Sequence, residues 1–214
     1  MSLAALLLLA DGRLPSGGHA HSGGLEPQIA AGRVRDVDGL DGFLRGRLTT
    51  SGLVAATFAA AACADVTRGA ELDAGLDVRT PSPALRRASR AQGRALLRAG
   101  RAMWPLPVIG REPHQPVALG VLAAAAGLTP AEAAVAAAHG TTTGSASAAV
   151  RLLGLDPYAV HALLARLAPE CDRIAAVAAA RSGDPVDELP AAGAPLLDIG
   201  AEHHATWEVR LFAS

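Results

Sequence analysis

The chain contains no lysine, few aromatic residues and only two cysteines. All 19 basic residues in the 214-residue sequence are arginine. A phosphate-binding P-loop needs a lysine that contacts the β- and γ-phosphates, and a Schiff-base enzyme needs a lysine amine. The absence of lysine therefore excludes both chemistries from this chain's own residues.

The charge is nearly balanced, with a formal net charge of −1. This gives no overall reason to expect nucleic-acid binding, which needs an excess of positive potential. Cys63 and Cys171 are far apart in the sequence and lack a CxxC pattern, so we expect buried free thiols, as in a reducing cytoplasm. The uncharged stretches contain too many small and polar residues for a membrane span, and the N-terminus lacks the features of a signal peptide. We expect a cytoplasmic protein.

Composition and local signals indicate helix. Alanine and leucine together supply 80 residues, and no run of alternating β-branched residues occurs. Thr129-Pro130-Ala131-Glu132 has the pattern of a capping box, and Asp156-Pro157 and Asp184-Pro185 place an aspartate cap before proline. We predict an all-α fold, a single globular bundle of about ten helices, with residues 1–214 forming one domain. The predicted helices are 2–10, 24–32, 37–64 with a possible break at Gly52, 66–76, 83–103, 115–127, 130–139, 143–154, 157–168, 170–182 and 195–206.

The segment from Leu14 to Glu26 is rich in glycine, which indicates a backbone with special dihedral angles. Three interpretations remain open. His19 and His21 could be metal ligands, together with residues such as His203 and His204. Ser22 could be the nucleophile of an elbow related to G-x-S-x-G. The segment could also be a structured loop in which one partly buried histidine is hydrogen-bonded to the backbone.

Five arginines form a stripe along the predicted helix 83–103. Their spacing of 3, 4, 4 and 3 residues places them on one face, and no acidic residue lies between Asp77 and Glu112. The stripe is either a solvated face or a docking surface for an acidic partner. Arginine is suited to such docking because its planar guanidinium group pairs with carboxylates. Gly93 within this helix indicates a close crossing by another segment. The stripe consists of Arg87, Arg90, Arg94, Arg98 and Arg101.

The C-terminal segment carries Trp207, Leu211 and Phe212 in a chain with few aromatics. Terminal tails usually fray, and apolar side chains are costly to expose. Either the core of this chain or a partner is therefore expected to receive them. His203 and His204 are adjacent, so on a helix they point about 100° apart and need not share a ligand.

Three segments together resemble the urease accessory protein F family. The first is Leu9-Ala10-Asp11 with Leu14-Pro15-x-Gly17 and His21-Ser22-x-Gly24-Leu25-Glu26. The second is Ser89-Arg90-x-Gln92-Gly93-Arg94-x-Leu96, and the third is Arg210-Leu211-Phe212-x-Ser214. Their order and spacing also fit, so the resemblance covers essentially the whole chain.

The resemblance implies an all-α fold and a non-enzymatic role in urease maturation. Proteins of this family form homodimers and bridge a D-type scaffold (also called H) and a G-type GTPase, which carries the P-loop. The complex assists nickel insertion into apo-urease, and the F-type member modulates the GTPase. No cofactor, nucleic acid or membrane is implied.

The resemblance also implies a set of partner-binding residues. The N-terminal element is expected near the scaffold interface, and the tail is expected to become ordered when the scaffold binds. Our leading hypothesis is accordingly an adaptor; the alternatives are a metallochaperone that binds nickel through His19, His21, His203 and His204, and a serine hydrolase that uses Ser22. The residues carried over are Pro15, Gly17, His21, Ser22, Gly24, Leu25, Glu26, Arg90, Gln92, Gly93, Arg94, Arg151, Arg210, Leu211 and Phe212.

Overall fold

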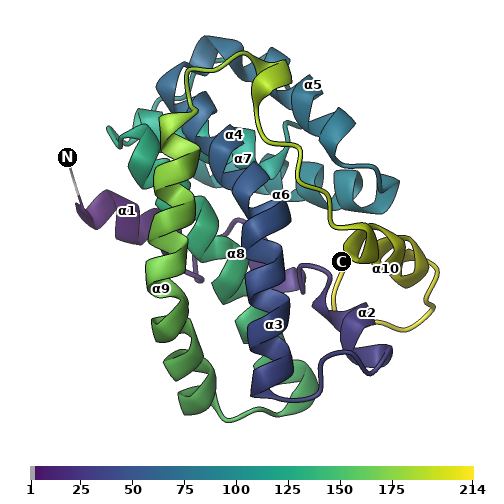
Figure 1. Cartoon of the computed structure of the whole chain (residues 1–214). Helices are drawn as coiled ribbons and strands as arrows, with labels where there is room; N and C mark the ends of the chain where they lie inside the picture. The colour runs from purple at the N-terminus through teal and green to yellow at the C-terminus, as the bar shows by residue number, and fades with distance from the viewer. Residues whose placement is uncertain (1–2) are drawn as a thin grey trace.

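The computed structural model describes residues 3–214, and within this range the chain forms ten α-helices and no strand (Figure 1). The prediction of an all-α bundle with about ten helices is confirmed. Short 3-10 turns and one π-helical turn, Leu48–Gly52, complete the regular structure. The α-helices are α1 (Leu3–Ala10), α2 (Leu25–Ala30), α3 (Val37–Arg47), α4 (Leu53–Ala64), α5 (Gly69–Arg79), α6 (Pro83–Arg101), α7 (Gln115–Ala125), α8 (Pro130–Leu153), α9 (Pro157–Ala180) and α10 (Pro195–Ala205).

Two of the three predicted start signals are confirmed. The Thr129 side chain accepts a hydrogen bond from the Glu132 amide, and the Glu132 carboxylate accepts one from the Thr129 amide, so α8 begins with a complete capping box. Asp156 caps α9 in the predicted way. Asp184 is different, because only a 3-10 turn without a side-chain cap follows it.

Two predicted helix breaks are wrong. Residues 130–139 and 143–154 belong to the single helix α8, and residues 157–168 and 170–182 largely to α9. In α8 the side chains of Thr142 and Ser145 are buried, and this packing keeps the polar stretch helical, while the hydroxyls of Thr141 and Thr143 donate to carbonyls one turn earlier. In α9, Pro169 lies in an exposed position of a helix whose other face is buried, and packing outweighs the lost hydrogen bond. Near Gly52 the helix does not break but widens into the π-helical turn.

The centre of the bundle consists of α4, α7, α8 and α9, which pack largely through alanine and leucine. Small residues allow very close approach. A Cβ atom on Gly120 of α7 would lie 2.3 Å from the Ala59 carbonyl oxygen of α4. The helical run Val37–Ala64 is long and apolar enough to cross a membrane by length and composition alone. It is instead a core element, since 61% of its most apolar window is buried inside the bundle.

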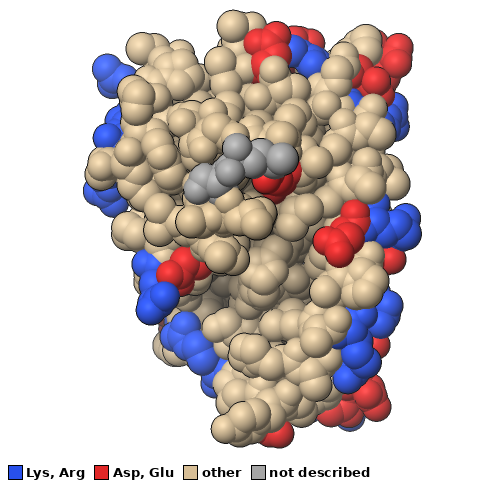
Figure 2. Space-filling view, turned by 90° about the vertical axis from the view of Figure 1, so that its left-hand side faces the viewer, with Lys and Arg blue, Asp and Glu red and all other residues tan. Residues whose placement is uncertain are grey.

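A second apolar cluster lies between α2, α3, α8 and α9, and it includes Phe212 from the C-terminal tail. In Figure 1 the helix α1 lies on the side of the bundle opposite to α2, α10 and the C-terminal tail. Few charged side chains surround it in the view of Figure 2, and Leu3 and Leu7 there are each 70% exposed.

Candidate functional site

The first and third motifs of the sequence, almost two hundred residues apart, meet in one place. The Glu26 carboxylate at the start of α2 accepts hydrogen bonds from His204 Nε2 at 2.9 Å, the Leu211 amide at 2.8 Å and the Phe212 amide at 3.0 Å. Glu26 and His204 are both buried. We call this contact region, formed by residues 14–26 and 201–214, the terminal junction.

Ser22 strengthens the terminal junction through backbone contacts. Its amide and its hydroxyl both donate to the Ser214 carbonyl, at 2.6 Å and 2.9 Å, and its hydroxyl accepts from the Glu26 amide. The Ala213 amide donates to the Ala20 carbonyl at 2.7 Å. The nucleophile-elbow interpretation is wrong, because a 3-10 turn rather than a strand precedes Ser22 and its side chain is fully buried.

Left-handed glycines shape the N-terminal loop, as its composition predicted. Gly17, Gly23 and Gly24 have φ angles of 75°, 66° and 85°. Pro15 is exposed on this loop, whereas Leu25 is fully buried in the second apolar cluster. The structured loop of the third interpretation is therefore confirmed, but its partly buried histidine, His21, contacts the Ser214 hydroxyl and not the backbone.

Sequence reasoning missed Arg47 of α3, which contacts the N-terminal loop from inside the protein. Its Nη1 donates to the Gly23 carbonyl at 2.7 Å and to the Ser145 hydroxyl at 2.8 Å, while Ser145 donates to the Ser22 carbonyl. Loss of hydration on burial lowers the pKa of Arg47 to about 10. Nothing in its sequence neighbourhood distinguishes it from the other arginines of α3.

Arg151 of α8 joins the terminal junction from a third element. Its guanidinium lies 4.7 Å from the centre of the Phe212 ring and donates to the His19 carbonyl at 3.2 Å. Phe212 is only 3% exposed, so the core of this chain receives it; Leu211, by contrast, is 55% exposed. The tail is already docked in the isolated chain, so its packing here does not depend on a partner.

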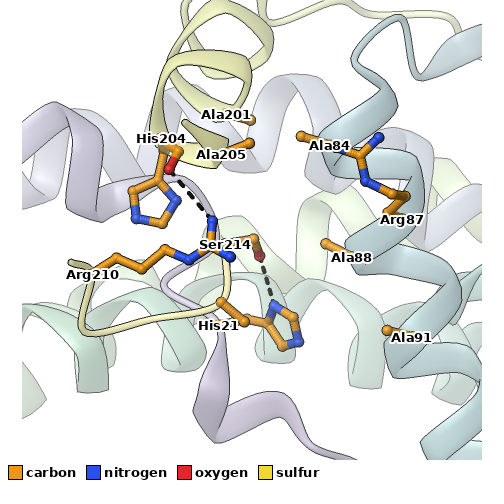
Figure 3. A pocket seen from close by; sticks show the side chains of 11 residues that line it. His21, Ala84, Arg87, Ala88, Ala91, Ala201, His204, Ala205, Arg210 and Ser214 are labelled. Carbon is orange, nitrogen blue, oxygen red and sulfur yellow. Dashed lines mark hydrogen bonds between the residues drawn. The ribbon is translucent and has the colours of Figure 1, made fainter. Parts of the chain in front are cut away.

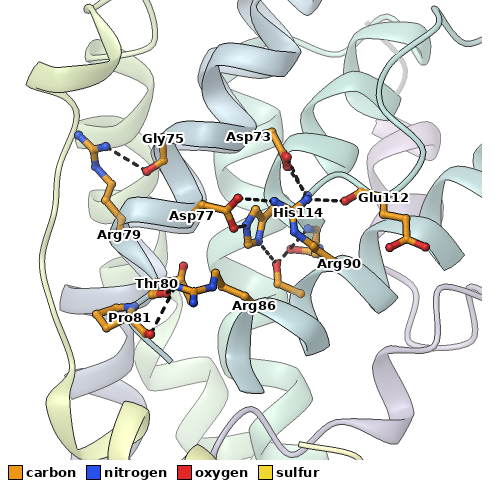
Figure 4. A network of polar contacts seen from close by, with 12 residues as sticks. Asp73, Gly75, Asp77, Arg79, Thr80, Pro81, Arg86, Arg90, Glu112 and His114 are labelled. Atoms are coloured by element: carbon orange, nitrogen blue, oxygen red, sulfur yellow. Dashed lines mark hydrogen bonds and ion pairs between the residues drawn. The ribbon is translucent and has the colours of Figure 1, made fainter. Parts of the chain in front are cut away.

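The arginine stripe of α6 is not free of counter-charge, contrary to the sequence-based expectation. Arg90 pairs with Asp73 at 2.9 Å and with Asp77 at 2.6 Å, and it donates to the Glu112 carbonyl (Figure 4). Arg94 pairs with the Glu112 carboxylate. The acids precede and follow the helix in sequence, and folding of α5 and the 102–114 loop against α6 brings them there.

His114, another residue that sequence reasoning missed, completes this network at the start of α7. Its Nε2 contacts Asp77 and its Nδ1 contacts the Ser89 hydroxyl, each at 2.9 Å, while its amide donates to Asp73 (Figure 4). The side chain is 1% exposed. Burial lowers the pKa of His114, although the hydrogen bond to Asp77 opposes this shift. We call Asp73, Asp77, Arg90 and His114 the helix network.

The predicted close crossing at Gly93 is confirmed, and the crossing segment is this chain's own. A Cβ atom on Gly93 would lie 2.0 Å from the Pro113 carbonyl oxygen, where the chain enters α7. Gln92 beside it is half-buried. In the central motif, Arg90 and Gly93 thus hold α6 against α5 and the start of α7, whereas Arg94 lies on the surface.

The four candidate histidines do not converge on one point, although His21 and His204 line the same pocket. His204 contacts Glu26, His21 Nδ1 lies 2.7 Å from the Ser214 hydroxyl, and His203 accepts from the Trp207 indole at 3.3 Å. His19 is exposed. Between residues 3 and 214, no group of three or more His, Cys, Asp or Glu side chains is placed to hold a metal ion.

A pocket of about 260 Å³ lies between α6, α10 and the tail (Figure 3). Close to the lining residue Ala84, Glu202 accepts hydrogen bonds from the Ser82 hydroxyl and the Ala84 amide, which lower the pKa of Glu202. This contact fixes α10 to the N-terminus of α6. The lining residues are His21, Ala84, Arg87, Ala88, Ala91, Ala201, His204, Ala205, Arg210, Ala213 and Ser214.

The fold and the terminal junction define an all-helical protein in which buried contacts join the N-terminal loop and α2 to the C-terminal tail. The model of the UreF family matches residues 34–168. The chain is 49% identical to the urease accessory protein UreF of Mycobacterium sp. (strain JLS), with alignment over 100% of this chain and 99% of the relative. It is 47% and 44% identical to the proteins of that name from Mycolicibacterium vanbaalenii and Mycobacterium tuberculosis (strain H37Rv), with the same coverage. The chain belongs to the UreF family.

Proposed function

We propose that this protein is a non-enzymatic adaptor of urease maturation in the cytoplasm. It binds the D/H-type scaffold and the G-type GTPase, forms a homodimer, modulates the GTPase and so assists nickel insertion into apo-urease. The observation that carries the proposal is similarity along the whole chain to proteins named urease accessory protein UreF.

The scaffold is proposed to contact the surface around the terminal junction. Apolar side chains of α10 and the tail are exposed beside it: Leu196 is 57%, Ile199 66%, Val209 88% and Leu211 55% exposed. Clusters of exposed apolar side chains are typical of protein interfaces. Because Glu26 and Arg151 hold the tail in place, the residues of the junction act by presenting this surface.

The outer arginines of α6 are proposed to contact an acidic surface of a partner. Arg98 and Arg101 are exposed and form no ion pair within residues 3–214, whereas Arg90 is committed to the helix network. The part of the stripe available for docking is therefore its outer edge. Such contacts steer association and weaken with salt.

Co-purification of the full chain with tagged scaffold and GTPase tests the proposal. We expect a ternary complex with the wild type, weaker scaffold capture by I199E, and weaker, more salt-sensitive capture of one partner by R98E/R101E. V78E and R166E are matched controls, since both residues are exposed and belong to α5 and α9, outside α6, α10 and the tail. Failure of folded wild-type protein to bind either partner would contradict the proposal. Light scattering tests the homodimer.

A further inference from the structure

The pocket between α6, α10 and the tail has the chemistry of a carboxylate site. Its walls are mainly alanine side chains, which offer no hydrogen-bonding groups, and no aspartate or glutamate lines it. Its polar side chains include the guanidinium groups of Arg87 and Arg210, which come from facing walls (Figure 3). Ser214, the last residue of the printed sequence, also lines the pocket, but its backbone oxygen accepts hydrogen bonds from the Ser22 amide and hydroxyl. A pocket lined by two guanidinium groups and no acidic side chain favours a negatively charged occupant.

The two arginines have donors to spare. Arg87 is exposed and makes no hydrogen bond or ion pair with any residue between 3 and 214, and Arg210 makes only one hydrogen bond, 3.5 Å long, to the His204 carbonyl. A guanidinium group has five N–H donors and prefers to donate two of them in parallel to a carboxylate. The charge of Arg87 contributes to lowering the pKa of Glu202, but the hydrogen bonds that the Glu202 carboxylate accepts come from Ser82 and Ala84.

Size and surroundings indicate what the occupant is. At about 260 Å³ the pocket is smaller than typical small-molecule sites of roughly 300–1,000 Å³, so it suits one side chain. Along α6 the exposed side chains of Arg98 and Arg101, which form no ion pair within residues 3–214, extend the positive charge to about 21 Å beyond Arg87, at about 1.5 Å per residue. An extended acidic segment of about six residues has this length.

We propose that this pocket binds the carboxylate of an aspartate or glutamate in an extended acidic segment of a partner protein, with the rest of the segment lying along α6. The inference names the chemistry of one contact in the proposed adaptor. It rests on the proposed function only in assigning the carboxylate to a partner.

A charged peptide tests this inference on the isolated full-length chain. The probe is a fluorescently labelled hexaglutamate with blocked ends, followed by fluorescence anisotropy and by the NMR signals of the His21 ring. We expect saturable binding with a shift of the His21 signals, while blocked hexaglutamine does not bind. R87Q should weaken the affinity about tenfold, because it removes charge-assisted hydrogen bonds, and R87K should restore only part of it.

R98Q is the matched control on the same helix outside the pocket, and we expect it to weaken binding by no more than about threefold. R210Q should act like R87Q, with the amide signals of Leu211 and Phe212 showing that the tail stays docked. Equal losses in R87Q and R98Q, or an unchanged His21 ring, would overturn the proposal. So would phosphate or glutarate that binds as tightly as the peptide, because the pocket would then be a small-anion site. None of these measurements needs another urease accessory protein, so their outcome is separate from that of co-purification.

Discussion

Two buried histidines, His204 and His114, each contact a carboxylate, and the two pairs differ in their surroundings. The pair in the terminal junction is enclosed, with the side chains of His204 and Glu26 only 2% and 10% exposed. In the helix network His114 is 1% exposed, but its partner Asp77 is 41% exposed. The first pair joins α2 to α10, whereas the second joins α5 to the start of α7.

This difference determines how each region responds to damage. A chain end can detach while the bundle stays folded, so the cost of any change in the terminal junction is limited to the free energy of docking the tail. Local detachment of this kind is not possible in the helix network, because α6 and α7 cannot separate without exposing the core. The terminal junction is therefore suited to rearrange when a partner binds, whereas the helix network keeps α6 and α7 in a fixed arrangement.

The largest effect is expected at Gly93, next to the helix network. In G93A the new methyl group would collide with the Pro113 carbonyl, which is backbone and cannot rotate away. We expect a loss of about 3 kcal/mol in the free energy of unfolding, measured by urea denaturation. G42A in α3 is the matched control, since a Cβ atom there meets nothing within 4 Å, and it should stabilise by about 0.5–1 kcal/mol. If the free energy of unfolding of G93A equals that of the wild type, the packing of α6 against α7 is less rigid than we infer.

Arg90 and Arg94 are neighbours on one stripe but should differ in their effect on stability. R90Q leaves Asp73 and Asp77 without their shared cation and should lower the free energy of unfolding by about 2 kcal/mol. R94Q removes an ion pair between side chains that are more than half exposed, and it should cost less than about 0.5 kcal/mol. Equal losses in both variants would show that the network contributes no more than a surface ion pair.

In the terminal junction we expect local detachment instead of unfolding. E26Q replaces one of the two oxygens that receive His204 and the tail amides, so the hydrogen bonds cannot all be kept. The amides of Leu211 and Phe212 should exchange with solvent much faster, while the free energy of unfolding falls by only about 1 kcal/mol. E208Q, an exposed change in the same tail, is the control. Global unfolding of E26Q would mean that the two regions do not differ in this way.

The sequence predicted much of the fold because its signals are local. The alanine- and leucine-rich composition favours helix locally, and the Thr129 and Asp156 caps act within one turn and located the starts of α8 and α9. The breaks expected near residues 140 and 169 were wrong because burial against neighbouring helices decides whether a polar stretch or a proline interrupts a helix.

The candidate site was only partly predictable, because its contacts are between segments far apart in sequence. The motifs around Glu26 and Phe212 were singled out, but nothing in the sequence indicated that one carboxylate joins them. Arg90 was grouped with four other arginines because helical spacing says nothing of acids on other helices. Arg47 and His114 lie outside any residue pattern, and only the fold reveals their burial and partners.

The smallest effect is the pH dependence of the helix network. Burial lowers the pKa of His114 below its ordinary value of 6.5, so on acidification the unfolded chain takes up the proton first. Stability should therefore decrease as the pH falls below about 6.5, by less than the roughly 1.4 kcal/mol per pH unit that one proton can contribute. Burial lowers the pKa of His21 and His139 as well, so the wild type combines three contributions. The pKa of Asp77 is lowered from 3.8, so its protonation lies below this window.

H114Q isolates the contribution of the helix network. The amide cannot be protonated in this range, so the decrease in urea midpoint between pH 7.5 and 5.5 should be smaller in H114Q than in the wild type, even if the variant is less stable at both pH values. An equal decrease would assign the pH dependence to His21 and His139. The acid-sensitive part of the protein would then include the N-terminal loop. The contribution of the helix network to stability would not change with pH in this range.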